Sequence, residues 1–161
     1  MRDAVLADNL SQADTMWQIR ERIALAQAQE GLNIKHDISV PISRIPDFCA
    51  HTDALLAQHI PGVRLVNFGH LGDGNLHYNV QAPVGVDAAA FLREHETDVN
   101  RLVFDSVQTF GGSISAEHGV GSLKVAHLEH YKSPVALGLM RAIKTALDPH
   151  NLMNPGRVLQ T

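Results

Sequence analysis

The sequence contains little cysteine and few aromatic residues. Cys49 is the single cysteine among the 161 residues, and aromatic residues make up 5% of the chain. One thiol can form neither an internal disulfide nor a cysteine-based zinc site, which excludes a disulfide-stapled secreted fold. A lone free thiol is typical of a reducing compartment, and we therefore expect a cytoplasmic protein.

Excess positive charge and long hydrophobic runs are also missing. Lysine and arginine number 13 against 17 acidic residues, so the formal charge is -4. Binding to nucleic-acid phosphates requires clustered cations, so we expect no nucleic-acid partner. No apolar run approaches the roughly 18 residues that a membrane-spanning helix needs, so we expect no integral membrane segment. No repeat or low-complexity tract divides the chain, which indicates one domain over residues 1–161.

Histidine is the residue that the chain has in surplus, with 10 copies. Several motifs that would explain function in another way are absent. No G-x-G-x-x-G follows a strand and opens a helix, no Walker motif is present, and no G-x-S-x-G marks a hydrolase nucleophile. The sequence therefore gives no support for a Rossmann dinucleotide site or a serine hydrolase, and imidazole groups become the first candidates for chemistry.

The spacing of apolar residues predicts an α+β fold. Spacings of three and four predict helices, and alternation predicts strands. The predicted helices are 11–30 with a stripe of Met16, Ile19, Ile23 and Ala26, 46–60, 88–110, 122–131 and 134–147; the predicted strands are 33–40, 64–70, 75–80 and 113–117. Between the leading and trailing helices, the order is that of a ferredoxin-like split βαβ, an antiparallel sheet with helices on one face. The other face is free to form one wall of a site.

A glycine-rich turn between two predicted strands carries two histidines. If Asp73 and Gly74 are the central residues of a tight hairpin, His70 lies directly opposite His77. Opposed residues have Cβ atoms about 4.5–5.5 Å apart, so both imidazoles can bind one metal at about 2.0–2.1 Å. Asn79 shares that sheet face. The alternative is that the two histidines only flank a turn selected for its glycines.

A second cluster pairs an acid with a base among glycines. Glu117 and His118 are adjacent within the segment 111–121. A Glu117 side chain that leans over the sheet would join the hairpin histidines in a three-ligand site with an open position, which is typical of a catalytic metal. The alternative is a surface loop with solvated charges. Lys35 and Arg20 have two readings as well, because each can clamp an anion or remain solvated.

Five segments in the same order resemble the C-terminal part of a known enzyme family. They are WQIRERI, IKHDISVP, GHLGDGNLHYNV, SISAEHGVG and DPHNLMNPGRVL. They resemble the FAD-linked oxidases of the vanillyl-alcohol-oxidase superfamily, and most closely the D-2-hydroxy-acid dehydrogenases for D-lactate, D-2-hydroxyglutarate and glycolate. In that family the FAD-binding domain lies N-terminal to this region. The resemblance thus implies a substrate- and metal-binding part that pairs with an FAD-binding domain of the same enzyme and is inactive alone.

The resemblance also implies roles for eight residues. The ligands of a divalent metal, expected to be zinc, would be His70, His77 and Glu117. The other roles would be substrate binding by Arg20, Lys35 and Asn79, general-base catalysis by His118, and a position close to the FAD ring for Asn154.

The expected activity is oxidation of a D-2-hydroxy acid to the 2-keto acid, with hydride transfer to flavin. Ala24 stands where relatives that bind a second substrate carboxylate often carry a hydroxyl residue, which favours a D-lactate-like substrate. Two alternatives come from other classes. One is a non-enzymatic module that binds a divalent metal, and the other is a structural or oligomerisation domain. A homodimer is compatible with each reading.

Overall fold

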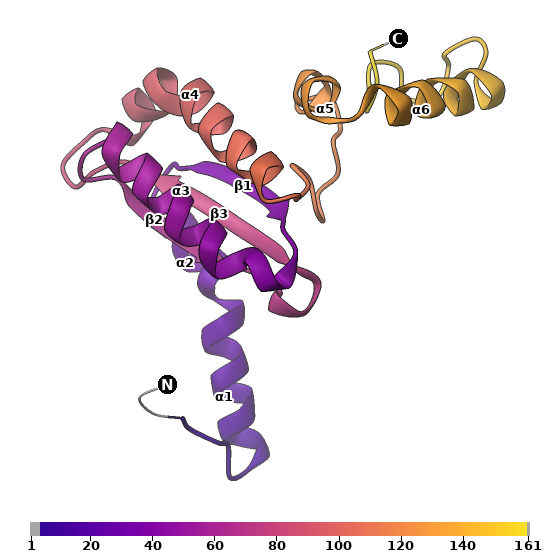
Figure 1. Cartoon of the computed structure of the whole chain (residues 1–161). Coiled ribbons are helices and arrows are strands. Elements are labelled where there is room, and N and C mark those ends of the chain that lie inside the picture. The colour runs from indigo at the N-terminus through magenta and orange to yellow at the C-terminus, as the bar shows by residue number, and fades with distance from the viewer. Residues whose placement is uncertain (1–3, 161) are drawn as a thin grey trace.

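The computed structural model describes residues 4–160, which fold around a three-stranded antiparallel sheet of order β1-β3-β2 (Figure 1). The elements follow one another as α1 (Leu10–Glu21), α2 (Ile23–Gln29), β1 (Ile34–Ser39), η1 (Ile42–Arg44), α3 (Ile45–His59), β2 (Arg64–Phe68), η2 (Leu71–Asp73), β3 (Asn75–Gln81), α4 (Ala88–Thr109), α5 (Val125–Tyr131) and α6 (Pro134–Leu147). The α+β class is confirmed, with helices at both ends of the chain.

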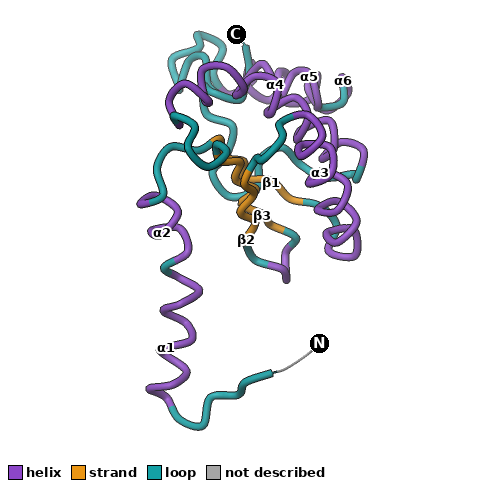
Figure 2. Tube along the Cα trace, turned by 90° about the vertical axis from the view of Figure 1, so that its left-hand side faces the viewer, coloured by secondary structure: helices purple, strands orange, loops and turns teal. Residues whose placement is uncertain are grey.

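Alternation along the strands separates a packed face from an open one. On β1 and β3 the apolar residues point toward α3 and α4, and Figure 2 shows these helices beside the strands. The main core comprises residues of both layers, including Ile34, Ile38, Tyr78, Val80, Phe48, Leu56, Phe91, Val99 and Val103. The residues between them along the strands face the other way, as their alternation in the sequence predicts.

The predicted fourth strand is reduced to a single bridge. Ser113 pairs antiparallel with Ser39 at the edge of β1, the position that a fourth strand occupies in the predicted topology. Gly112 allows this approach, because a Cβ atom there would lie 2.2 Å from the Ser39 carbonyl oxygen. Beyond Ser113 the backbone leaves the sheet, so the expectation of a strand over 113–117 is wrong. The segment is instead a loop that is free to cross the open face.

The hairpin register differs from the prediction. Residues 71–73 coil into η2, which ends at Gly74 with φ +78°, so the strands already separate after Phe68. His77 therefore faces Phe68, and the opposition of His70 and His77 expected from a two-residue turn is wrong. A two-residue shift leaves every side chain on the same face, so His77 and Asn79 still lie on the open face.

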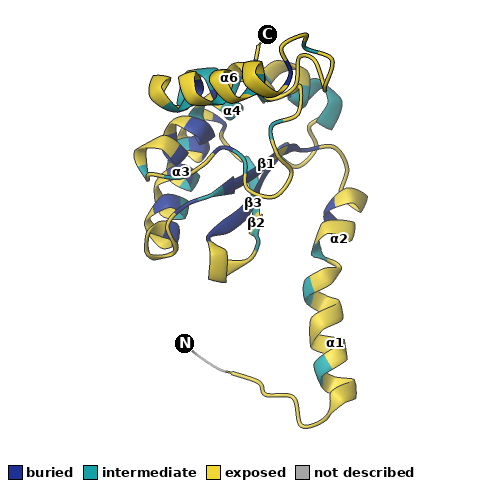
Figure 3. Cartoon of the chain, turned by 90° about the vertical axis from the view of Figure 1, so that its right-hand side faces the viewer, coloured by how far each residue is buried: buried dark blue, intermediate teal, exposed yellow. Residues whose placement is uncertain are grey.

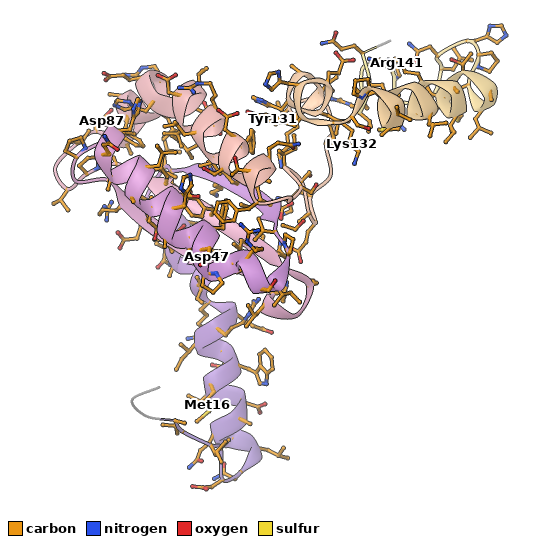
Figure 4. All side chains as sticks on the ribbon, viewed as in Figure 1. Met16, Asp47, Asp87, Tyr131, Lys132 and Arg141 are labelled. Carbon is orange, nitrogen blue, oxygen red and sulfur yellow. The ribbon has the colours of Figure 1, made fainter. Side chains whose placement is uncertain are left out.

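The leading helix is not packed as its apolar stripe predicts. A single helix over 11–30 is expected, but the helix is interrupted at Arg22, between α1 and α2. The sequence at this point contains no glycine or proline that explains the interruption. No described residue of α1 is buried, and Ile19 is 70% exposed. Figures 3 and 4 show α1 extending away from the sheet, with Met16 on it. Within this chain, the stripe has no surface to cover.

The C-terminal helices form a second, smaller core. Leu128 of α5, Leu137 of α6 and Leu159 of the tail pack together. An ion pair between Arg141, marked in Figure 4, and Glu129 joins the two helices, with an N–O distance of 2.7 Å. The opposite side of α6 is uncovered, as Figure 3 shows, and exposes four apolar residues at steps of four, Val135, Leu139, Ile143 and Leu147. Along residues 4–160 we find no helix that combines the length and hydropathy of a membrane span.

His36 lies in the main core, where burial lowers its pKa to about 4. Its Nδ1–H donates to the Tyr78 carbonyl at 2.8 Å, and its ring packs against Phe104. Between pH 6.5 and 4 the unfolded chain binds a proton that the folded chain excludes, so stability must fall as the pH falls through this window. From pH 7 to pH 5 we expect this histidine to cost about 2 kcal/mol of unfolding free energy.

Urea unfolding at pH 7 and pH 5 measures this effect when the protein is compared with His36→Asn, whose amide can still donate to Tyr78. The variant loses ring packing at both pH values, but its stability should depend less on pH by about 2 kcal/mol. Equal pH dependence in the two proteins would show that His36 is not held neutral in the folded state.

Candidate active site

Polar side chains of two neighbouring strands gather on the open face of the sheet. Lys35 pairs in register with Asn79, and Asp37 with His77. Directly opposed residues share a face, so these four side chains form one patch. The patch lines a pocket of about 680 Å³. The loop that follows α4 supplies the other wall.

The loop 113–121 places Glu117 and His118 over this patch. It is fixed at one end by the bridge between Ser113 and Ser39. Within the loop, the Ser115 hydroxyl donates to the Gly119 carbonyl at 2.7 Å, which closes a tight turn around the acid–base pair. Both residues line the pocket. Glu117 thus leans over the sheet toward the hairpin histidines, which is the condition that the three-ligand hypothesis sets.

Glu117 lies between the two histidines that the sequence singles out. Its Oε1 is 3.0 Å from Nδ1 of His70, and its Oε2 is 3.4 Å from Nε2 of His77. Two ligands at about 2.1 Å from one tetrahedral metal are about 3.4 Å apart, so these separations fit shared coordination. Two imidazoles and a carboxylate are also a donor set that zinc accepts. His77 and Glu117 thus fit a divalent metal, whereas His70 reaches Glu117 but is not in the group of donors whose ligand atoms all lie within 4.8 Å of one another.

A neighbouring acid extends this cluster. Asp37, His77, Glu117 and His118 each offer one ligand atom within 4.8 Å of the others. Sequence reasoning missed Asp37, because a single acid on a strand face looks solvated. In the structure it is 4% exposed. The usable signal was its alternation with Ile34, His36 and Ile38, which places it beside Lys35 on the open face.

The charge of Asp37 is maintained although burial by itself raises the pKa of a carboxyl. Backbone N–H groups of His118 and Glu117 donate to it, the nearby His118 imidazole attracts it, and the Asn75 amide adds a further bond. Together these hold the pKa of Asp37 below its usual range. The pocket therefore contains an ionised buried carboxylate beneath the loop.

Cationic groups surround the same pocket. Lys35, Lys124 and Arg157 line it. Burial lowers the pKa of Lys124, partly offset by Asp37, and its Nζ donates to the Ile114 carbonyl at 3.0 Å. Arg157 comes from the tail, where the Val158 N–H bonds the Gly121 carbonyl at 2.8 Å. An anionic ligand would be well matched to this wall.

The pocket brings together five of the eight residues chosen from the sequence, namely Lys35, His77, Asn79, Glu117 and His118. His70 contacts Glu117 from outside the pocket lining. Arg20 lies in the last turn of α1, away from the lining. Asn154 is exposed in the tail turn at φ +49°, and it is Arg157, three residues later, that reaches the pocket.

Fold and site together define a class: an α+β domain whose open sheet face, crossed by one loop, forms a pocket for an anionic ligand beside a metal-type cluster. The family described as FAD linked oxidases, C-terminal domain, matches residues 1–158. The chain belongs to this family, and the resemblance inferred from its motifs is confirmed.

Relatives with curated names agree with this assignment. The chain is 40% identical to a D-2-hydroxyglutarate dehydrogenase of Stutzerimonas stutzeri (strain A1501) over 97% of the chain and 33% of the relative. It is 43% identical to one of Xanthomonas citri pv. viticola over 99% of the chain and 33% of the relative. A mitochondrial one of Rattus norvegicus is 36% identical over 98% of the chain and 28% of the relative. The chain thus spans about a third of the length of these relatives.

Proposed function

We propose that this chain is the substrate-binding part of an FAD-dependent dehydrogenase that oxidises a D-2-hydroxy acid to the 2-keto acid with assistance from a divalent metal. The observation that carries the proposal is that a carboxylate, two imidazoles, a lysine and an amide line one pocket. These groups belong to Glu117, to His77 and His118, to Lys35 and to Asn79. A metal store or a structural domain needs neither the anion-binding groups nor the base.

The pocket residues divide into binding and proton-transfer groups. Lys35 and Asn79, opposed on β1 and β3, bind the substrate carboxylate by charge and by amide hydrogen bonds. His118 is the proposed acceptor of the substrate hydroxyl proton, because its imidazole lines the pocket beside His77, with 5.7 Å between the ring centroids. Removal of this proton and of the C2 hydride leaves the 2-keto acid.

The remaining chemistry comes from bound groups. When bound, a metal held by His70, His77 and Glu117 supplies Lewis-acid polarisation, and FAD supplies the hydride acceptor. The carboxylates of Asp37 and Glu117 keep this end of the pocket negative, whereas Lys35 and Arg157 make the rest cationic. A substrate carboxylate is therefore drawn toward the cationic region and away from the two carboxylates.

The FAD-binding part is the proposed partner of the uncovered helices. Relatives are about three times as long as this chain, so an intact enzyme offers a large additional surface. The exposed apolar stripe of α6, Val135, Leu139, Ile143 and Leu147, is the side on which we place that partner. Exposed apolar rows of this kind mark interaction surfaces. We propose that the same partner also packs against the exposed apolar residues of α1.

Two substrates compete, and each has an observation in its favour. The relatives are named D-2-hydroxyglutarate dehydrogenases, and Arg157 gives the pocket a cation for a second carboxylate. Ala24 also lines the pocket, and its methyl group favours a smaller acid such as D-lactate. The presence of Arg157 makes D-2-hydroxyglutarate our first candidate.

Anaerobic mixing of the full-length, FAD-loaded protein with D-2-hydroxyglutarate, D-lactate and the corresponding L-acids tests the proposal. We expect bleaching of the flavin absorbance by the D-acids alone, with D-2-hydroxyglutarate giving the higher kcat/KM. Bleaching by neither D-acid, at any metal supply, would contradict the proposed activity. A higher kcat/KM for D-lactate would select the second substrate.

A further inference from the structure

Asp37 is held by more donors than any other carboxylate of the candidate site. Its Oδ2 accepts the backbone N–H groups of three consecutive residues, Ala116 at 3.3 Å, Glu117 at 2.9 Å and His118 at 2.7 Å. Its Oδ1 accepts the Asn75 side-chain amide at 2.9 Å. Successive N–H groups that point at one anion form a concave anion-binding nest, and here the anion is the protein's own side chain.

These bonds leave Asp37 little capacity to bind a metal. An ionised carboxylate has about two lone-pair sites on each oxygen, so the three donors on Oδ2 fill that oxygen and the Asn75 bond leaves one site on Oδ1. Its nearest approaches to the two neighbouring imidazoles, 4.0 Å to His77 Nδ1 and 3.8 Å to His118 Nδ1, are outside hydrogen-bond range. Glu117 is different, because its side chain is 41% exposed and both of its oxygens point at histidine nitrogens.

The same bonds determine where Glu117 and His118 sit. Among the described residues, the backbone of this stretch has few other anchors: the Ala116 N–H is shared with the Asp37 carbonyl at 3.3 Å, and Ser113 is bridged to Ser39. Asp37 and Ser39 belong to β1, most of which is buried. Their bonds therefore anchor the loop to the sheet. Loss of the Asp37 carboxylate would leave three partly buried N–H donors without their shared acceptor.

We infer that Asp37 is the positioning residue of the site: it is not a metal ligand, and it fixes the loop 115–118 so that Glu117 and His118 meet the strand residues. This inference rests on the proposed metal-assisted function and adds to it the group that assembles the site. Partners that orient metal ligands typically contribute 10–100-fold to metal affinity. Asp37 acts on the metal through Glu117 and on the substrate proton through His118.

Zinc titration of the metal-free, full-length protein against a competing chelator tests the inference. We expect Asp37→Asn to bind Zn²⁺ about 10–100-fold more weakly, and amide hydrogen exchange at residues 116–118 to become faster. Saturating Zn²⁺ should restore metal content but only part of the turnover, because His118 also loses the backbone hydrogen bond to Asp37 that holds it in place. Asp53→Asn is the matched control, since Asp53 accepts the Tyr78 hydroxyl on the other face of the sheet and should leave zinc affinity unchanged.

A second variant protects the test if Asp37→Asn folds poorly. Asn75→Ala removes the amide bond to Oδ1 together with a longer bond from the same amide to the Ile38 carbonyl. We expect a smaller loss of zinc affinity in the same direction, with faster exchange at 116–118. Unchanged zinc affinity and unchanged exchange in both folded variants would overturn the positioning role. If Glu117→Gln also kept full zinc affinity, the metal site itself would be wrong, so the two failures are distinguishable.

Discussion

Glu117→Gln in the full-length protein should remove most of the bound metal and reduce kcat/KM at least about 100-fold, because Lewis-acid assistance supplies several kcal/mol of transition-state stabilisation. Glutamine preserves the shape of the side chain but lacks the negative charge. Both carboxylate oxygens of Glu117 face histidine nitrogens, at 3.0 Å and 3.4 Å, so no spare oxygen can compensate.

Metal content per chain, measured by elemental analysis beside steady-state kinetics, checks this prediction. Glu96→Gln is a suitable control, because Glu96 is exposed on α4 and its change should alter neither quantity. Thermal stability should change little, since Glu117 is itself 41% exposed and outside both cores. Wild-type metal content in Glu117→Gln would remove this residue from the ligand set.

The sequence was a good guide to the fold wherever the signal was local. Asp87 accepts the Ala90 N–H at the start of α4, and Ser133 accepts the Ala136 N–H at the start of α6, as their positions before helical patterns predict. The alternation in 33–40 placed Lys35 on the correct face, and the two-residue step from His77 did the same for Asn79. Helix caps and strand alternation depend on a few residues that are neighbours in the sequence, so they can be predicted without knowledge of the tertiary structure.

Errors arose where the answer depends on distant contacts. Gly74 could close a two-residue turn, but a Cβ atom there would lie 2.2 Å from the Val40 carbonyl oxygen, so the turn is shaped by its packing on another segment. The stripe of α1 predicted burial, but among residues 4–160 no element covers it. Asp37 was overlooked because its four donors come from residues 38 to 81 positions away.

The site was predictable in composition more than in geometry. Glycines at 111–121 indicated that the backbone around the adjacent Glu117 and His118 can approach a ligand closely, but the segment was expected to be a strand over 113–117, and the structure places a loop over the sheet there. The role of Arg157 could not be read from the sequence, since it depends on a backbone bond between Val158 and Gly121. Family resemblance alone suggested Arg20 and Asn154, and neither residue lines the pocket.

His118→Ala should lower kcat about 10²–10⁴-fold while metal content stays near one per chain, which is the range that loss of a general base produces. The imidazole is 68% exposed and reaches the pocket from the loop, so its removal leaves a gap that solvent can enter. The backbone N–H of residue 118 still bonds Asp37 in the variant, because alanine retains that donor. The loop, and with it Glu117, should therefore remain in place.

Chemical rescue separates a base from a ligand at this position. Added imidazole should restore part of the turnover of His118→Ala, because a small base can enter the exposed gap and accept the hydroxyl proton. His59→Ala is the control: His59 is exposed in the last turn of α3, and its variant should retain full activity and show no response to imidazole. Loss of metal from His118→Ala, with turnover restored by zinc and not by imidazole, would instead make His118 a ligand. The proton would then have to be taken by another group of the pocket.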